Sequence, residues 1–405
     1  MFSNKLINKN FMLLSKKSKL FLEEKNKILV KRNKETNIFD GFIFKLLYSQ
    51  KRVGQIDVVK EINDFKHKFT DRNCYLDRTK LITEDFLCDY FKFLDEGINN
   101  IFYKDQRLNT TILPVVSCDG SKSIAYYSSK NKPSKKKNKN DTFTFLNMGM
   151  FNVTYNEPCL LKPVEHKNER KAMLDNLNNN SNPTIYVSDR GFQAEYLFNK
   201  LNNNGDYFIC RLRSNSLVID KSIINDEYYV NMSDIPNVRI INYKINDNDY
   251  YIATNVPKFM YNINDILNIY HKRWIVEEYF KYIKNNMKMD NFSEKDWMKI
   301  KASIYCNLII SKLTYLIQNI FMKKIKNKNQ TINKASLTRD LYKKFLIRFI
   351  FNLKFSERFL IKFFKIAIDI IITHLDISNP RRSMFPYTKW YIKGYHKKYI
   401  LEEIK

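Results

Sequence analysis

The segment 270–284 constrains the fold of this chain more than any other, because it is long, amphipathic and free of glycine and proline. Asn262 and Asp265 form a helix start signal before it, so we predict one helix of roughly 25 residues. At about 100° per residue, one flank of this helix is an apolar stripe. The stripe consists of Ile269, Val276, Phe280, Ile283 and Met287. We expect this flank to pack on a core.

The neighbouring flank of the same helix carries four polar groups. Within an arc of roughly 60° lie Tyr270, Arg273, Glu277 and Lys284. This set suits a helix that holds one metal-binding acid against a phosphate backbone. The alternative is a solvated helix with ordinary i,i+4 charge pairs. However, the spacing Tyr-x2-Arg-x3-Glu-x6-Lys would arise by chance in on the order of half a per cent of such chains.

Two short apolar segments upstream each end on an aspartate. Residues 112–118 precede Asp119, and residues 184–188 precede Asp189. Both segments predict buried strands. An aspartate at a strand end is more often a turn former or a helix cap, so each one is weak evidence by itself.

The order of the predicted elements indicates a fold. Further strands are predicted at 124–127, 142–155 and 207–213, and helices at 169–177 and 193–201. Three strands, helix, strand, helix, strand is the order of the ribonuclease H-like fold. Its first and fourth strands are neighbours in a mixed five-stranded sheet, which would bring Asp119 and Asp189 side by side. We therefore predict an α/β (α+β) ribonuclease H-like core with flanking helices.

The segments around this core predict a five-part chain. We expect a basic N-terminal arm (1–35), a helical DNA-binding domain (36–108), the core (109–213 and 261–297), a β-rich insertion (214–260) and a C-terminal helical region with a basic tail (298–405). The insertion contains a predicted hairpin. Near residues 56–80, two helices and a tight turn resemble a helix-turn-helix. An ordinary helical hairpin remains an equal alternative, because the turn lacks the glycine that is often found there.

The charge balance favours a polyanionic partner. Lys and Arg total 70 against 42 Asp and Glu, a formal net charge of +28. Such an excess promotes nucleic-acid binding through phosphate neutralisation and counterion release. AT-rich codon usage would raise the lysine content without explaining the low number of acids. No apolar run approaches the ~18 residues of a membrane span, so no membrane partner is expected.

Cysteine and histidine are too scattered for a zinc site or a disulfide framework. The six cysteines include no Cys-x-x-Cys pair, and the five histidines are equally dispersed. A reducing compartment fits this usage best. We expect a cytoplasmic, nucleoid-associated protein in a bacterial host, or a nuclear one in a eukaryote.

The four-residue helix pattern and the two upstream aspartates, in this order, resemble the DDE transposases of bacterial insertion sequences, specifically the insertion-sequence-4-like family. The resemblance covers about residues 110–310. It implies an enzyme that cleaves transposon ends and transfers the freed 3′-hydroxyl into target DNA. Asp119, Asp189 and Glu277 would be the catalytic residues and the ligands of two Mg²⁺ ions, with Mn²⁺ able to substitute. Oxygen ligands of this kind suit such hard cations.

The resemblance also implies DNA contacts and partners. Tyr270, Arg273 and Lys284 would hold phosphates around the cleaved end, and Arg190 and Lys281 are secondary candidates. Trp274 could stack on a base, although core packing is the better interpretation. The partners would be double-stranded DNA, namely the terminal inverted repeats and the target, and a second protomer in a synaptic homodimer. The C-terminal helices are the candidate dimer surface.

Two departures from the family pattern leave alternatives open. Ser121 stands where relatives often have threonine, and the insertion lacks the tryptophan with which some relatives hold a flipped base. A tyrosine could stack there instead, at about 1–3 kcal/mol per base, but the sequence assigns none. The rival hypotheses are a catalytically inactive, domesticated transposase that only binds DNA, and a ribonuclease H-like nuclease without strand transfer.

Overall fold

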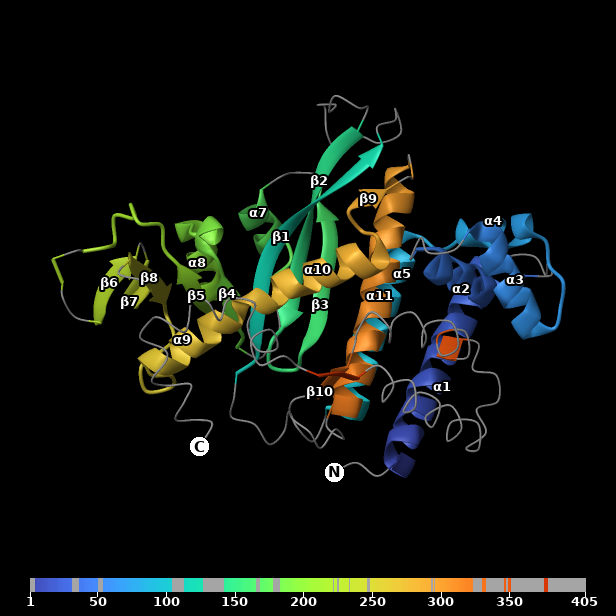
Figure 1. Cartoon of the computed structure of the whole chain (residues 1–405), viewed down its shortest axis with the longest axis horizontal. Coiled ribbons are helices and arrows are strands. Elements are labelled where there is room, and N and C mark those ends of the chain that lie inside the picture. The colour runs from blue at the N-terminus through green and yellow to red at the C-terminus, as the bar shows by residue number, and fades with distance from the viewer. Residues whose placement is uncertain are drawn as a thin grey trace.

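A computed structural model gives the architecture of the chain. It describes residues 4–30, 36–49, 54–103, 113–126, 142–164, 168–177, 183–220, 222–223, 226–232, 234–245, 248–292, 294, 296–322, 330–332, 346, 349–350 and 375–377. N-terminal helices stand at one end, a large sheet occupies the middle and the other end, and helix α11 runs between them (Figure 1). The basic tail and most of the C-terminal region beyond α11, which was predicted to supply the dimer surface, lie outside the described residues.

The described strands of the core belong to one nine-stranded sheet, ordered β3-β2-β1-β4-β5-β8-β7-β6, with β9 paired to β1 off this path. Its first five strands are β1 (Val115–Tyr126), β2 (Thr142–Asn152), β3 (Glu157–Val164), β4 (Ile185–Ser188) and β5 (Tyr207–Arg211). Strands β1, β2 and β3 pair antiparallel, whereas β1, β4 and β5 pair parallel. This arrangement confirms the ribonuclease H-like core and the predicted contact between its first and fourth strands.

The first three strands differ from the predicted segments. The strands expected at 112–118 and 124–127 are one continuous strand, β1, and Asp119 lies within it rather than at its end. The segment expected at 142–155 ends earlier, at Asn152, and β3 follows as a strand that was not predicted. Asp-Gly-Ser at 119–121 has the composition of a turn, but pairing with β2 across Asp119↔Gly149 keeps it extended.

The β-rich segment extends the same sheet. It contributes β6 (Glu227–Met232), β7 (Ile235–Ile245) and β8 (Asn248–Thr254), and β8 pairs antiparallel with β5. The predicted hairpin is therefore present as β7 and β8, although two residues of its turn, 246–247, lie outside the described part. The sheet is consequently wider than the five strands that were expected.

Helices cover both faces of the core sheet. On one face, α7 (Glu169–Leu174) packs on β1 and β2, and α8 (Glu195–Asn203) packs on β5, in a buried cluster that includes Cys118, Met148 and Phe208. On the other face, α10 (Ile275–Met287) and α11 (Trp297–Met322) pack on Phe145 and Phe151. Side chains alternate between the faces of a strand. Glu169 of α7 lies against Gly120, so the neighbouring Asp119 points to the opposite face of the sheet. Helix α10 lies across that face (Figure 1).

The N-terminal helices form a packed layer. They are α1 (Asn4–Leu29), α2 (Ile38–Ser49), α3 (Gln55–Lys66), α4 (Arg72–Thr79) and α5 (Glu84–Phe102). Phe11, Leu14 and Leu22 of α1 are buried in this layer, so the segment expected as an arm is largely a docked helix. Helices α3 and α4 match the two helices of the expected hairpin; its role in DNA binding stays a prediction.

Helix α11 joins the N-terminal layer to the sheet. Within the described residues it is the one helix long and apolar enough to cross a membrane, and 94% of that window is buried inside the molecule. The fully buried Lys312 of α11 makes ion pairs with Asp95 of α5 and with Glu157 of β3, the latter at 3.0 Å. This lysine links both layers through one side chain.

Candidate active site

The helix predicted over about 25 residues is interrupted at its centre. Helix α9 (Ile263–His271) leads into a 3-10 turn, η2 (Lys272–Trp274), and then into α10. The expected start signal is confirmed, because the side chain of Asn262 and that of Asp265 each accept the other's backbone N–H at 3.0 Å. The interruption has a local cause, since Ser117 Oγ of β1 donates to the Arg273 carbonyl at 2.6 Å.

A glycine sets how closely α10 approaches the sheet. Gly149 of β2 is the register partner of Asp119. A Cβ at Gly149 would lie 2.5 Å from Cζ of Phe280, so the phenyl ring rests directly on the strand. Phe280 is one helical turn after Glu277. The absent side chain at 149 therefore lets α10 bring Glu277 towards Asp119.

The two aspartates belong to neighbouring parallel strands. Asp119 Oδ1 accepts the backbone N–H of Gly120 at 2.8 Å. Asp189 directly follows β4 and caps the short turn η1 (Arg190–Phe192), where its Oδ1 accepts the N–H of Gly191 at 2.7 Å. Both carboxylates are thus fixed by backbone donors close to the strands that carry them.

The three predicted carboxylates influence one another electrostatically. Burial raises the pKa of Asp119 to about 7; Asp189 and Glu277 add to this effect, while the Gly120 N–H and Arg273 oppose it. Burial also raises the pKa of Glu277, and Arg273 again opposes the shift. Acids that are half-buried together without a bound cation are expected to resist ionisation in this way.

The donor chemistry of this cluster fits a hard divalent cation. Carboxylate oxygens are the ligands that Mg²⁺ prefers. Within the described part of the chain, no three His, Cys, Asp or Glu side chains are gathered closely enough to hold one metal ion. In a two-ion arrangement, however, a pair of carboxylates can serve each ion. Asp119 interacts with both Asp189 and Glu277, so two such pairs are available.

Arg273 lies inside this cluster instead of facing solvent. It is only 6% exposed, and its Nη1 is 2.8 Å from Oε1 of Glu277. Its guanidinium also lies over the Trp274 ring, 4.8 Å from the centroid. Its Nε is buried and has no hydrogen-bond partner among the described residues. Arg273 is therefore the counterion of Glu277 in this structure.

The other predicted DNA-binding residues fall into two groups. Tyr270 and Lys284 interact electrostatically with the aspartates. Burial raises the pKa of Tyr270 to about 12; Arg273 opposes this shift, and Asp189 adds to it. Burial lowers the pKa of Lys284, which Asp290 and Asp119 counteract.

The second group lies further out or serves packing. Arg190 is exposed beside Asp189, and Lys281 pairs with Glu278 at 2.6 Å on the outer face of α10. Trp274 is half-buried beneath the Arg273 guanidinium, which agrees with packing better than with an open base-stacking platform.

Glu169 is a nearby carboxylate that the sequence did not single out. A Cβ at Gly120 would lie 2.5 Å from Glu169 Oε1, and one at Gly191 would lie 3.7 Å from Oε2. Burial, and then Asp189, raises the pKa of Glu169. The Glu169 side chain therefore lies close to the backbone that follows each aspartate, at Gly120 and at Gly191. The only sequence signal for Glu169 is its position in the first turn of the helix, directly after the N-cap Asn168.

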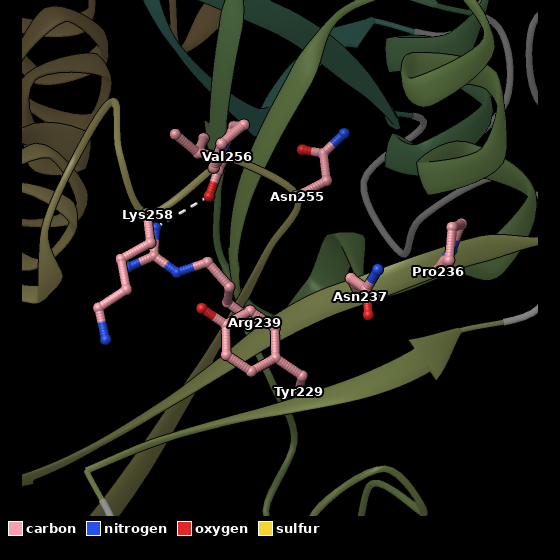
Figure 2. A pocket seen from close by; sticks show the side chains of 8 residues that line it. Tyr229, Pro236, Asn237, Arg239, Asn255, Val256 and Lys258 are labelled. Atoms are coloured by element: carbon pink, nitrogen blue, oxygen red, sulfur yellow. Dashed lines mark hydrogen bonds between the residues drawn. The ribbon is translucent and has the colours of Figure 1, made fainter.

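A separate pocket of about 490 Å³ lies in the β-rich extension (Figure 2). It is lined by Tyr229, Pro236, Asn237, Arg239, Asn255, Val256, Pro257 and Lys258. Asn255 Oδ1 accepts the N–H of Phe208 at 2.8 Å, near the start of β5. Asp189 follows the opposite, carboxyl end of the parallel strand β4. The pocket therefore lies at the other edge of the sheet and is not the carboxylate site.

The pocket wall is held by a buried arginine. Arg239 Nη1 donates to the carbonyls of Val256 and Tyr261 at 2.8 and 2.9 Å, and its Nε donates to Glu227 at 2.5 Å. Figure 2 shows the contact with Val256. These bonds compensate for the burial of Arg239. They also join the β-rich extension to the segment that leads into α9.

The order and pairing of β1 to β5 are those of a ribonuclease H-like domain. Residues 119–312 match the family model described as "Transposase DDE domain". The matched segment begins at Asp119 and includes Asp189 and Glu277. Residues 119–312 are therefore similar to a transposase DDE domain, in agreement with the resemblance of the sequence to the insertion-sequence-4-like family.

Two known proteins are similar to parts or all of the chain. A protein of Synechocystis sp. with the name "Putative transposase for insertion sequence element IS4SA" is 27% identical over 145 residues. The match spans 34% of this chain and 41% of that relative. The solved piggyBac transposase, in a synaptic complex with hairpin DNA, has 12% identity and a TM-score of 0.47, covering 91% of this chain and 85% of that one.

Proposed function

We propose that the chain is a DNA transposase that cleaves phosphodiester bonds at transposon ends and transfers the freed 3′-hydroxyl into target DNA. The observation that carries this proposal is the match of residues 119–312 to a transposase DDE domain model, within which Asp119 and Asp189 belong to neighbouring parallel strands and α10 carries Glu277. The order of the three acids and the helix pattern around Glu277 support the same function.

The proposed role of each acid follows from its neighbours. Asp119 interacts with both other carboxylates, so it would contribute to two adjacent metal sites, which Asp189 and Glu277 would complete on either side. Bound Mg²⁺ or Mn²⁺ would supply an activated attacking oxygen and stabilisation of the leaving oxygen. Tyr270, a phenol beside Asp189, would orient the phosphate from one side of the cluster.

Lys284 would assist from the other side. Its ammonium is half-buried and close enough to Asp119 to influence its own pKa. A lysine here would act as a point charge for a phosphate oxygen. The net charge of +28 further supports double-stranded DNA as the partner. Synapsis of two transposon ends by two protomers remains part of the proposal.

The test uses the full chain and a duplex containing the inverted repeats that are expected to flank its gene. We expect Asp119→Asn to abolish Mg²⁺-dependent end cleavage while DNA binding, measured by mobility shift, is retained. Glu278→Gln is the matched control, because Glu278 is exposed and next to Glu277 but pairs with Lys281. The control should cleave like the wild type.

Two results would select the rival functions. A wild-type protein that binds end DNA but never cleaves it with Mg²⁺ or Mn²⁺ is an inactive DNA-binding relic. A protein that cleaves, but does not join supplied pre-cut 3′-hydroxyl ends to target DNA, is a nuclease without strand transfer.

A further inference from the structure

The Arg273–Glu277 pair differs from the ion pair next to it on the same helix. The side chains of Lys281 and Glu278 are 53% and 45% exposed, whereas those of Arg273 and Glu277 are 7% and 25% exposed. An exposed pair contributes little, because water screens it. A largely buried pair holds its partners much more firmly, since separating them leaves a buried charge uncompensated.

Arg273 is surrounded by groups that a cation attracts. Glu277 faces it from α10, Asp119 from β1 and the Tyr270 phenol from α9. Its backbone is held to β1 by Ser117, at the 3-10 turn that separates α9 from α10. Short 3-10 turns within helices often mark hinges. The guanidinium therefore lies where its positive charge compensates the negative charges of Glu277 and Asp119.

The same guanidinium has unused donor capacity. Its Nε is buried and has no hydrogen-bond partner among the described residues, although buried donors are nearly always satisfied. A phosphate oxygen is an acceptor that suits a guanidinium fork well. Arg273 thus pairs with Glu277 through Nη1, while its Nε–H can still donate a hydrogen bond to an anion.

We propose that Arg273 is a place-holding cation that competes with a divalent metal ion for Glu277 until DNA engages it. Without DNA, its positive charge disfavours metal binding at Glu277. When a phosphate enters the site, the guanidinium pairs with the phosphate and releases Glu277 to the metal. This inference rests on the proposed function, from which it takes the metal and the DNA.

Competition of this kind predicts the direction in which DNA and the loss of Arg273 change the metal affinity. Binding of metal and of DNA must be coupled, and each must strengthen the other by the same factor. Removing the guanidinium should therefore strengthen metal binding in the free protein and abolish its strengthening by DNA. If Arg273 only held the cluster together, its removal would loosen the cluster and weaken metal binding in the free protein.

The experiment measures Mn²⁺ affinity by isothermal titration calorimetry with the full chain, first without DNA. We expect Arg273→Gln to bind Mn²⁺ roughly 3- to 10-fold more tightly than the wild type, the range of a moderate ion pair. Arg273→Lys, which keeps the charge but loses the fork, should be intermediate. The matched control Lys272→Gln removes an exposed charge one residue away and should change the affinity less than about twofold.

The second arm adds a saturating duplex with the transposon end. The wild type should then bind Mn²⁺ more tightly than before, and Arg273→Gln should not. Far-ultraviolet circular dichroism and thermal unfolding check that each variant is folded. If Arg273→Gln does not fold, the intermediate affinity expected of Arg273→Lys still decides the outcome.

Wild-type-like or weaker Mn²⁺ binding by the folded arginine variants would overturn this inference. That result leaves the proposed function intact as long as the wild type binds Mn²⁺ and cleaves transposon ends. A wild type that neither binds Mn²⁺ nor cleaves refutes the proposed function itself, so the two failures are distinguishable.

Discussion

At the scale of single residues, the acidic cluster is assembled at a cost to stability. Asp119 is partly buried and has two other carboxylates as neighbours, and its pKa rises to about 7 mainly because of burial. Its pKa in the folded protein thus lies above its ordinary value of 3.8. A carboxyl group shifted in this direction makes the folded state less stable as the pH rises from about 4 through about 7.

This shift predicts a stabilised variant. With metal removed by a chelator at pH 8, Asp119→Asn should raise the free energy of unfolding by about 1–2 kcal/mol, less than the full shift implies because the site is partly solvated. Denaturant unfolding measures this difference, which should shrink towards pH 4. Equal stability of the two proteins at pH 8 would show that Asp119 carries no such penalty.

The residues of the site were predictable to different degrees. Asp119 and Asp189 could be paired from sequence, because the order of strands and helices determines which strands are neighbours. The burial of Arg273 could not, because it depends on Ser117, from a distant strand, and on the interruption of the helix at η2. Glu169 was missed because the sequence predicted its helix at 169–177, but not that this helix would place the side chain against Gly120 and Gly191.

At the scale of elements, the distance between α10 and the sheet decides whether Glu277 reaches the aspartates. That distance rests on the contact between Phe280 and the glycine at 149. A helical periodicity predicts which face of α10 is buried, and the stripe of Val276, Phe280, Ile283 and Met287 is indeed buried. It does not predict how close the helix comes, because that depends on the partner strand.

We therefore predict that Gly149→Ala impairs the site without altering any carboxylate. The added methyl group would force α10 outwards, at a cost of about 1–3 kcal/mol in the free energy of unfolding, and end cleavage should fall. The measurements are denaturant unfolding and the end-cleavage assay.

A second substitution provides the control. Phe280→Leu in the same chain removes ring atoms where the new methyl group lies, so the double variant should recover part of both stability and cleavage. Additive losses in the double variant would show that the two positions do not act through this contact.

At the scale of the whole molecule, α11 connects the N-terminal helices to the core sheet. The sequence predicted a helical region from residue 298 onwards, but not that its first helix would be buried on nearly all sides. The reason is that its neighbours α2, α5 and β3 come from distant segments. Lys312 lies in the middle of this contact and pairs with acids from both layers.

Loss of this lysine should uncouple the two layers. Lys312→Met keeps the length of the side chain but leaves Asp95 and Glu157 without their cation, and we expect a loss of about 3–5 kcal/mol in the free energy of unfolding. Denaturant unfolding at pH 7 measures it. The triple variant with Asp95→Asn and Glu157→Gln should recover stability; no recovery would mean that the lysine acts by packing alone.

Convergence of the three carboxylates on one metal centre is tested most directly by titrating Mn²⁺, observed by electron paramagnetic resonance, into the full chain and its amide variants. Asp119→Asn, Asp189→Asn and Glu277→Gln should each lose at least one bound ion, and Asp119→Asn should weaken both. Glu278→Gln should bind Mn²⁺ like the wild type. Undiminished Mn²⁺ binding by any of the first three variants would contradict a shared site.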